Sequence, residues 1–421
     1  METNFFPTVN FAPGDWLLWA GRGATVRRGW LGRRYVYLLG PRANEFVFGH
    51  DHLFRWREAF ASLIPVDGET SVVVSDGEAH GRRRGLVRPA LDRRHVDGYV
   101  DVIARTAAEA LDAVRPGELV DGYQVLRAAI RRATMRALFG ESVGGHADDM
   151  GDLLQPLIDL TDLLPDTVAV HRRLRTPRWR RAMAVRRQLD AFIGSEIARA
   201  RAGDAPPDRV LSTLVHGRDG SGPGLSETEI RDQMVTLIAA GYETTSAAMA
   251  WTLYGLAVRP DLVGRATEEA SRACEIGLTA SAMGEMEWVG AIVREALRLY
   301  PPAVVSARYV AEDFTVEGRR VRAGTMLLYS PYATHRDPRV YDEPLAFRPE
   351  RWLCGATRPA SEYLPFGGGH RCLGSTMATT ELTVMLATLL ARGGYQLEAG
   401  RVRARGYAAM RPRDGLPMRL R

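Results

Sequence analysis

The most informative segment of the chain is Phe366-Gly-Gly-Gly-His-Arg-Cys372-Leu-Gly374, where one cysteine stands in a glycine-rich loop before a helix predicted over 376–390. A helix N-terminus and the neighbouring Arg371 stabilise a thiolate, which is the form of cysteine that binds metal. The glycines let the backbone wrap closely around the sulfur. A phosphate-binding loop is the competing interpretation, but no Gly-Lys-Ser/Thr follows the glycines. The segment therefore predicts a thiolate that binds a metal.

A second motif is the Glu–Arg pair in Glu295-Ala-Leu-Arg298-Leu-Tyr-Pro-Pro302, inside a helix predicted over about 285–299. Residues three apart share one face of a helix, so the two side chains are neighbours. Taken alone, such a pair is more often an exposed ion pair that contributes little stability. Downstream, Pro349-Glu-Arg351-Trp352 offers another arginine that can join the pair in a buried network.

A third motif lies in the middle of a long helix. Ser226 and Glu229 form a capping box at its start, and the apolar pattern then runs from 230 to about 258. At the centre stands Ala240-Gly241-Tyr242-Glu243-Thr244-Thr245, whose glycine, acid and threonines oppose helix propensity. The Thr244 hydroxyl can bond the carbonyl of Ala240 and loosen the helical ladder there. Alone, this motif is read as a tolerated irregularity in a buried helix.

In this order and spacing, the motifs resemble those of the cytochrome P450 family, the haem-thiolate monooxygenases, in their bacterial soluble form. The resemblance runs from about residue 30 to the end of the chain. It implies a mainly α fold with minor β (α+β), with haem b between two long helices. We expect a single domain over 1–421, with β-rich parts at about 30–75 and 303–330. The helical core is expected at about 78–300 and the cysteine loop at 365–375.

The resemblance also implies roles for single residues. Cys372 is the expected axial ligand of the haem iron. Thr244 and Glu243 are the expected catalytic residues, because a hydroxyl can hold water and a carboxylate can pass protons during oxygen activation. Ala240 and Gly241 are expected beside the haem, where Gly241 leaves room for O₂. The family's fold-locking triad falls on Glu295, Arg298 and Arg351.

Buried haem propionates need charge-assisted hydrogen-bond donors. The matching family positions are His80, Arg84, Arg308 and His370. One departure concerns this part of the chain. The family usually places a phenylalanine seven residues before the cysteine, whereas Phe366 stands six before Cys372 and Pro365 occupies the usual site. The loop is thus one residue short, which puts the packing of Phe366 on the haem in doubt and leaves Arg371 facing solvent.

The substrate is expected to be a mid-sized hydrophobic molecule, such as a terpenoid, a steroid-like compound or a polyketide of secondary metabolism, that is hydroxylated or epoxidised. By resemblance, mostly small apolar residues line its site: Val235, Ala239, Val304, Val305 and Ala409. Two alternatives stay open. The chain can be a peroxide-driven haem-thiolate peroxygenase or isomerase, or a haem-binding protein without turnover, which the short loop favours.

The charge and composition of the chain limit the kinds of partner that it can bind. The 421 residues carry a net charge of +6, and all 56 basic residues are arginine, because the sequence has no lysine. No flavin or iron–sulfur domain is recognisable, so electrons must come from an external donor. An acidic ferredoxin fits Arg88, Arg93 and Arg94, which the resemblance puts near the cysteine side of the haem. Nucleic-acid binding is not expected, since 50 acidic residues are interspersed.

Cysteine usage and local pattern give the remaining expectations. Three cysteines do not make a disulfide framework, and no apolar run is long enough to span a membrane, so we expect a cytoplasmic monomer. Cys274 and Cys354 are expected to be packing residues. Residues 203–224 are expected to form a long exposed connection, and the tail from 395 a β-hairpin with its turn near 412–415.

Overall fold

The computed structural model describes residues 25–28, 34–141, 147–163, 165–218, 222–398, 402–406 and 408–421. Its helices are α2 (Pro41–Gly49), α3 (Trp56–Ala59), α4 (Ile64–Asp67), α5 (Gly77–Val87), α6 (Arg93–Asp97), α7 (Val100–Asp112), α8 (Gly122–Phe139), α10 (Ala147–Thr161), α11 (Pro165–Leu174), α12 (Pro177–Ala202), α13 (Val210–His216), α14 (Glu227–Ala257), α15 (Pro260–Glu275), α16 (Ala280–Glu285), α17 (Glu287–Leu299), α18 (Pro331–Thr334) and α19 (Ser375–Ala391). Its strands are β1 (Thr25–Arg28), β2 (Arg34–Tyr37), β3 (Phe54–Arg55), β4 (Leu119–Asp121), β5 (Ser306–Val310), β6 (Phe314–Val316), β7 (Arg319–Val321), β8 (Thr325–Tyr329), β9 (Tyr395–Leu397), β10 (Ala404–Arg405), β11 (Arg411–Pro412) and β12 (Pro417–Leu420).

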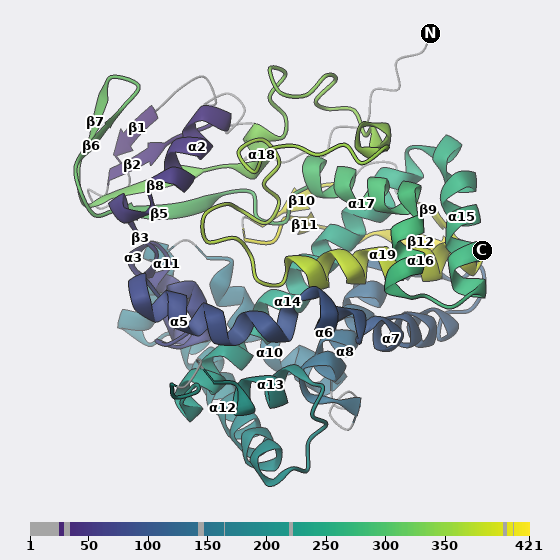
Figure 1. Ribbon diagram of the computed structural model, residues 1–421, viewed down its shortest axis with the longest axis horizontal. Helices are drawn as coiled ribbons and strands as arrows, with labels where there is room; N and C mark the ends of the chain where they lie inside the picture. The colour runs from purple at the N-terminus through teal and green to yellow at the C-terminus, as the bar shows by residue number, and fades with distance from the viewer. Residues whose placement is uncertain are drawn as a thin grey trace.

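The main sheet combines strands that precede the long helices in the sequence with strands that follow them. Its strand order is β1-β2-β8-β5-β3, so segments almost 300 residues apart pair, as Arg34 does with Thr325. Figure 1 shows this sheet on one side of the molecule and most of the helices on the other. Strands β5 to β8 lie in the part at 303–330 that was expected to be β-rich. At 30–75 the expectation was only partly right, since α2, α3, α4 and single 3-10 turns fill most of that stretch.

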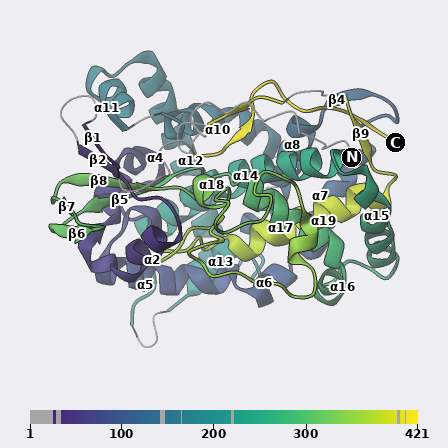
Figure 2. The ribbon, with the colours of Figure 1, turned by 90° about the horizontal axis from the view of Figure 1, so that it is seen from above.

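Helix α14 is the axis of the helical part. Ser226 accepts a hydrogen bond from the Glu229 backbone, and Glu229 bonds back to the Ser226 N–H, so the predicted capping box is present. Most of the helix is buried, because α8, α12, α17 and α19 pack around it. In Figure 2, α14 runs between α10 and α12 on one side and α17 and α19 on the other. An amphipathic pattern is therefore weak in α14, as expected of a helix covered all round.

The Glu295–Arg298 pair is buried inside the protein. Glu295 and Arg298 have no exposed side-chain surface and lie 2.8 Å apart. The Glu295 carboxylate also accepts hydrogen bonds from Arg351 Nε at 3.1 Å and from Trp352 Nε1 at 2.8 Å. Arg298 donates in addition to the carbonyls of His335, Pro344 and Ala346. The network thus ties α17 to the irregular stretch that leads to the cysteine loop, and the predicted triad is assembled.

Three local expectations were wrong. The 203–224 stretch contains helix α13, whose Val210, Leu211 and Leu214 are buried in the main core. The tail is not one hairpin, because β10 pairs with β11 while β12 pairs with β4 and β9. Cys354 is exposed and has a positive φ, so it is not a packing residue. In the described ranges, no helix combines the length and hydropathy that crossing a bilayer requires.

Candidate functional site

The cysteine loop is held tightly from three sides. Gly367 and Gly369 have φ values of +72° and +68°, which favour glycine, and a Cβ at Gly368 would lie 2.3 Å from the Phe48 ring. Arg308 donates from Nη2 to the Gly368 carbonyl at 3.1 Å. The Cys372 N–H donates to the Phe366 carbonyl at 3.0 Å and closes the loop. The loop therefore has a defined shape although it is one residue short.

Cys372 stands just before α19 with its side chain exposed. The Gly374 N–H bonds its sulfur. Burial raises the pKa of the thiol, while Gly374, Arg84 and Arg371 act in the opposite direction. Cys372 is an exposed residue whose sulfur is nevertheless largely surrounded by protein, so the thiol is open on one side only. Such a thiol is reachable by a ligand, and binding a metal removes its proton.

A cluster of nitrogen donors comes together from separate segments. His80 on α5 stacks on His370 of the cysteine loop, with ring centroids 3.8 Å apart. Burial, followed by the charges of His80, Arg308 and Arg84, lowers the pKa of His370 to about 3. Burial also lowers the pKa of His80, so both rings are neutral at pH 7. Arg84 is close enough for its charge to act on Cys372.

Arg308 gives the most direct indication that the site suits an anionic group. Its side chain is fully buried, and two of its nitrogens bond to the carbonyls of Ala307 and Gly368. Its Nε is buried and has no hydrogen-bond partner among the residues that the structure describes. A buried, charged donor without a partner is costly. The carboxylates of a haem would supply such a partner, so the residues present fit this group.

The opposite side of the site is the middle of α14. Ala240 is exposed, and Gly241 and Thr244 are only half-buried, although the helix is otherwise covered. The Thr244 hydroxyl donates to the Ala240 carbonyl at 2.7 Å, as its sequence position suggested. The structure adds a packing reason for Gly241, because a Cβ there would lie 3.2 Å from Thr134 of α8. Close packing of α8 on α14 thus requires a small residue at this position.

Glu243 is held by side chains that sequence reasoning missed. Arg127 Nε donates to its Oε2 at 2.9 Å, and the Tyr123 hydroxyl lies 3.4 Å from its Oε1. Arg411 Nε is 3.5 Å from the same Oε1 and pairs in turn with Asp162. The carboxylate therefore joins α8, α14, the end of α10 and the C-terminal strands. No local signal marks Arg127 or Arg411 among the chain's many arginines.

A second missed acid is Glu381 on α19. It is buried where α8, α14 and α19 meet, with the Thr134 hydroxyl 3.4 Å from its Oε1. Thr245 on α14 is its other hydrogen-bond partner. Burial raises the pKa of this carboxyl to about 8, so it is mostly protonated at pH 7. A threonine-bonded, neutral acid thus lies directly under the A-G-x-E-T-T segment.

The residues expected to line the substrate site divide into two groups. Val235, Val304 and Ala409 are buried to 3% exposure or less, and the two valines belong to the main core. These three are therefore packing residues, and their assignment as lining was wrong. Ala239 and Val305 are half-buried and keep surface to offer a ligand. Phe366 is also half-buried and packs against the core, and Arg371 is exposed as expected.

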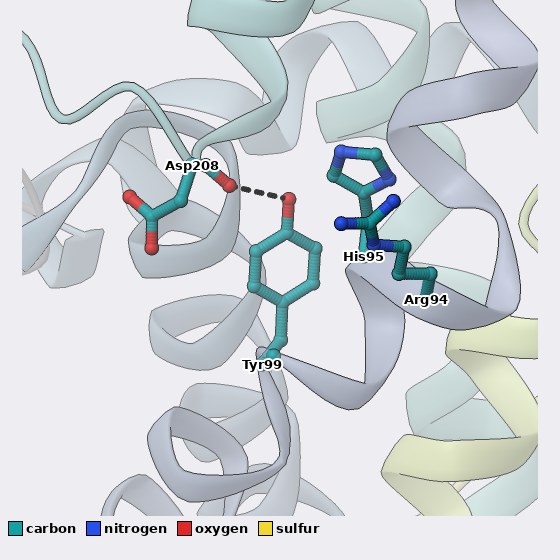
Figure 3. Close-up of a pocket in the computed structure, with 5 residues that line it drawn as sticks. Arg94, His95, Tyr99 and Asp208 are labelled. Carbon is teal, nitrogen blue, oxygen red and sulfur yellow. Dashed lines mark hydrogen bonds between the residues drawn. The ribbon is translucent and has the colours of Figure 1, made fainter.

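Two cavities lie outside this cluster. One of about 340 Å³ is lined by Arg94, His95, Gly98, Tyr99 and Asp208. Figure 3 shows the Tyr99 hydroxyl bonded to the Asp208 carbonyl, with Arg94 and His95 together on one side of the ring. The other, of about 410 Å³, lies beside α4, α12 and α14, and its lining includes Ile64, Pro65, Trp179 and Arg231.

Comparisons with known proteins agree with this geometry. The cytochrome P450 family model matches residues 21–399. The chain is 44% identical over 413 residues to "Putative cytochrome P450 139" of Mycobacterium tuberculosis (strain ATCC 25618 / H37Rv), covering 96% of each protein. It is 31% identical over 331 residues to the "Cyclooctat-9-en-7-ol 5-monooxygenase" of Streptomyces melanosporofaciens, covering 76% of this chain and 72% of that protein. The solved structure "Retinoic acid bound cyanobacterial CYP120A1" superposes with a TM-score of 0.87 at 24% identity, covering 97% and 93% of the two chains.

Proposed function

Since the chain belongs to the cytochrome P450 family and is a haem b monooxygenase, we propose that Cys372 supplies the thiolate that binds the iron. Bound haem supplies the oxidative chemistry, which is the activation of O₂ and the insertion of one oxygen atom into the substrate. Two observations together carry the proposal: Cys372 is exposed, and the buried Nε of Arg308 has no hydrogen-bond partner among the described residues. A metal ion would be bound by the first group, and a carboxylate would pair with the second.

We assign the haem carboxylates to the donor cluster: His80, Arg84, Arg308 and His370. The fully buried Arg308 offers a charged donor, and the two neutral imidazoles offer N–H donors. Arg84 also lies near Cys372, where its charge favours the thiolate. These four residues would hold the carboxylates of a bound haem.

Proton delivery is assigned to Thr244 and Glu243. The Thr244 hydroxyl donates to the Ala240 carbonyl, which leaves its oxygen free to accept a hydrogen bond from water. Glu243 is adjacent in sequence, but its carboxylate is engaged by Arg127 and approached by Arg411. It carries protons when that ion pair opens or when water reaches its free lone pairs.

The substrate class follows from the surfaces that remain available. Ala239 and Val305 are small and apolar, which suits a hydrophobic molecule of secondary metabolism such as a terpenoid, a steroid-like compound or a polyketide. The Streptomyces relative is named for the oxidation of cyclooctat-9-en-7-ol, an alcohol, and this supports hydroxylation of a largely hydrocarbon skeleton. The cavity beside α4 and α12 is the candidate entry route.

The electron donor is assigned to the face that carries α6 and the turn before it. Arg88, Arg93 and Arg94 are exposed there, and α6 packs against α19, the helix that follows Cys372. An acidic ferredoxin matches this charge. The cavity of Figure 3, whose lining includes Arg94 and Tyr99, is a candidate recess for one side chain of the donor.

Reduction by ferredoxin tests this function against its rival. One observation favours a peroxide-driven enzyme. Arg127 holds the Glu243 carboxylate in an ion pair, and a peroxide-driven reaction needs no proton from Glu243 because peroxide brings its own protons. With ferredoxin, ferredoxin reductase and NADPH, the monooxygenase forms product only in the presence of O₂. Arg94→Glu should slow this reaction and leave peroxide-driven turnover unchanged, whereas Arg319→Glu on β7 should change neither. Peroxide-driven turnover much faster than ferredoxin-driven turnover, with Arg94→Glu without effect on either, would favour the rival.

A further inference from the structure

A stack of four side chains runs through the donor cluster and includes one residue that no motif marks. The Arg308 guanidinium lies 3.7 Å from the ring centroid of Trp56. Trp56 stacks on His370, with centroids 4.6 Å apart and planes 15° from parallel. His370 stacks in turn on His80, at 3.8 Å and 13°. Trp56 is therefore the link between two of the assigned carboxylate donors.

We propose that Trp56 is a positioning residue for the haem carboxylates, which it serves by holding Arg308 and His370 in their places. The inference rests on the donor assignment above. A cation over an indole face and a pair of stacked rings are each favourable and directional contacts. They fix the plane of the guanidinium, whose Nε has no hydrogen-bond partner, and the plane of the imidazole. Trp56 needs no contact with the haem to do so.

The backbone at Trp56 is held by the carboxylate of Asp76. This residue lies next to the helix that carries His80, which is at the other end of the stack. The Trp56 N–H donates to Asp76 Oδ1 at 2.7 Å, and the Arg57 N–H donates to Oδ2 at 3.0 Å. Asp76 is the residue that precedes α5, the helix that carries His80. Its side chain caps α3 and makes no cap hydrogen bond to its own helix. One aspartate thus sets the distance between the segments of Trp56 and His80.

The short cysteine loop explains why such a support is needed. His370 lies in a segment with one residue fewer than usual between Phe366 and Cys372, and neighbouring Gly369 has a positive φ. The imidazole is held by ring contacts with Trp56 and His80. Stacking on both sides therefore fixes the plane of the His370 ring.

The test is the rate of haem loss from purified holoprotein to an excess of apomyoglobin. Loss of the Trp56 contacts with Arg308 and His370 in the Trp56→Leu variant should raise this rate about tenfold, as expected from one stacking and one cation–π contact. Trp56→Phe keeps an aromatic face and should stay within about twofold of the parent rate. Phe60→Leu is the matched control, because Phe60 packs against Trp56 but has no ring contact with His370.

Each outcome of the haem-loss experiment supports or refutes the positioning role of Trp56. If Trp56→Leu and Trp56→Phe lose haem equally fast, or neither differs from the parent, the positioning role is refuted. Arg308→Ala and His370→Ala separate this result from the proposed function. If these two variants retain haem as the parent does, the donor assignment itself is wrong. If they lose haem quickly while Trp56→Leu does not, the donors stand and only the role of Trp56 falls.

Discussion

Arg127 of α8 donates from Nε to Oε2 of Glu243 on α14 across 2.9 Å, in a place where both side chains are nearly buried. The pair holds the expected proton carrier against α8. Arg411 is the other cation beside this carboxylate, at 3.5 Å. The position of Glu243 is thus set by residues that lie 116 and 168 positions away in the sequence.

This pair should contribute measurably to stability. Arg127→Met leaves Glu243 with Arg411 as its remaining charged neighbour, so the free energy of unfolding should fall by about 1–3 kcal/mol. Urea unfolding of the parent, Arg127→Met, Glu243→Gln and the double variant gives the coupling of the two side chains. Additive single effects would mean that the two side chains do not interact in solution.

Removal of the Thr244 hydroxyl should uncouple electron use from product formation. Thr244→Ala should lower the product formed per NADPH by about tenfold, because the hydroxyl that orders water for proton delivery is lost. Thr244→Ser keeps the hydroxyl and should retain most of the coupling. The measurement is product, NADPH and hydrogen peroxide in one reaction. Equal coupling in the alanine variant and the parent would remove Thr244 from the proton path.

Glu381 should make the protein less stable as pH rises. Burial raises the pKa of its carboxyl from 4.5 to about 8 in the folded chain, so the folded state binds more protons between these values. Stability relative to Glu381→Gln should therefore be full below pH 4.5 and decline by up to about 1.4 kcal/mol per pH unit towards pH 8. Unfolding of both proteins at pH 5 to 8.5 tests this. A difference that is flat across this range would place the carboxylate in water.

The buried triad should matter far more than a similar pair at the surface. Glu295→Gln leaves Arg298 and Arg351 without their carboxylate and should cost about 3–5 kcal/mol of stability. Glu268→Gln is the matched control, since Glu268 and Arg272 form a helical pair whose side chains are 71% and 67% exposed. The control should change stability by less than about 0.5 kcal/mol. Similar losses in both variants would contradict a special role for the triad.

The helices and the motifs were predictable because local chemistry specifies them. The capping box at Ser226, the proline stop after Leu299 and the Glu295–Arg298 spacing each act within a few residues. Helix α13 was missed because seven residues between glycines and prolines carry a weak pattern, and tertiary packing on α8 and α12 decides their conformation.

The partners of the site residues were not predictable for a different reason. Arg127, Arg411 and Trp56 reach the site through contacts that no spacing encodes. The substrate residues show the same limit. The direction of each side chain depends on how the segments pack, and Val235, Val304 and Ala409 are buried in the protein.

The account depends most on Cys372 as the iron ligand, and the carbon monoxide difference spectrum of the reduced holoprotein tests this directly. A thiolate ligand gives a strongly red-shifted Soret band, because it donates electron density to the iron. We expect that band in the parent and its loss in Cys372→Ser, with Cys354→Ser as the unchanged control. A parent spectrum typical of a neutral thiol or an imidazole ligand would contradict the account.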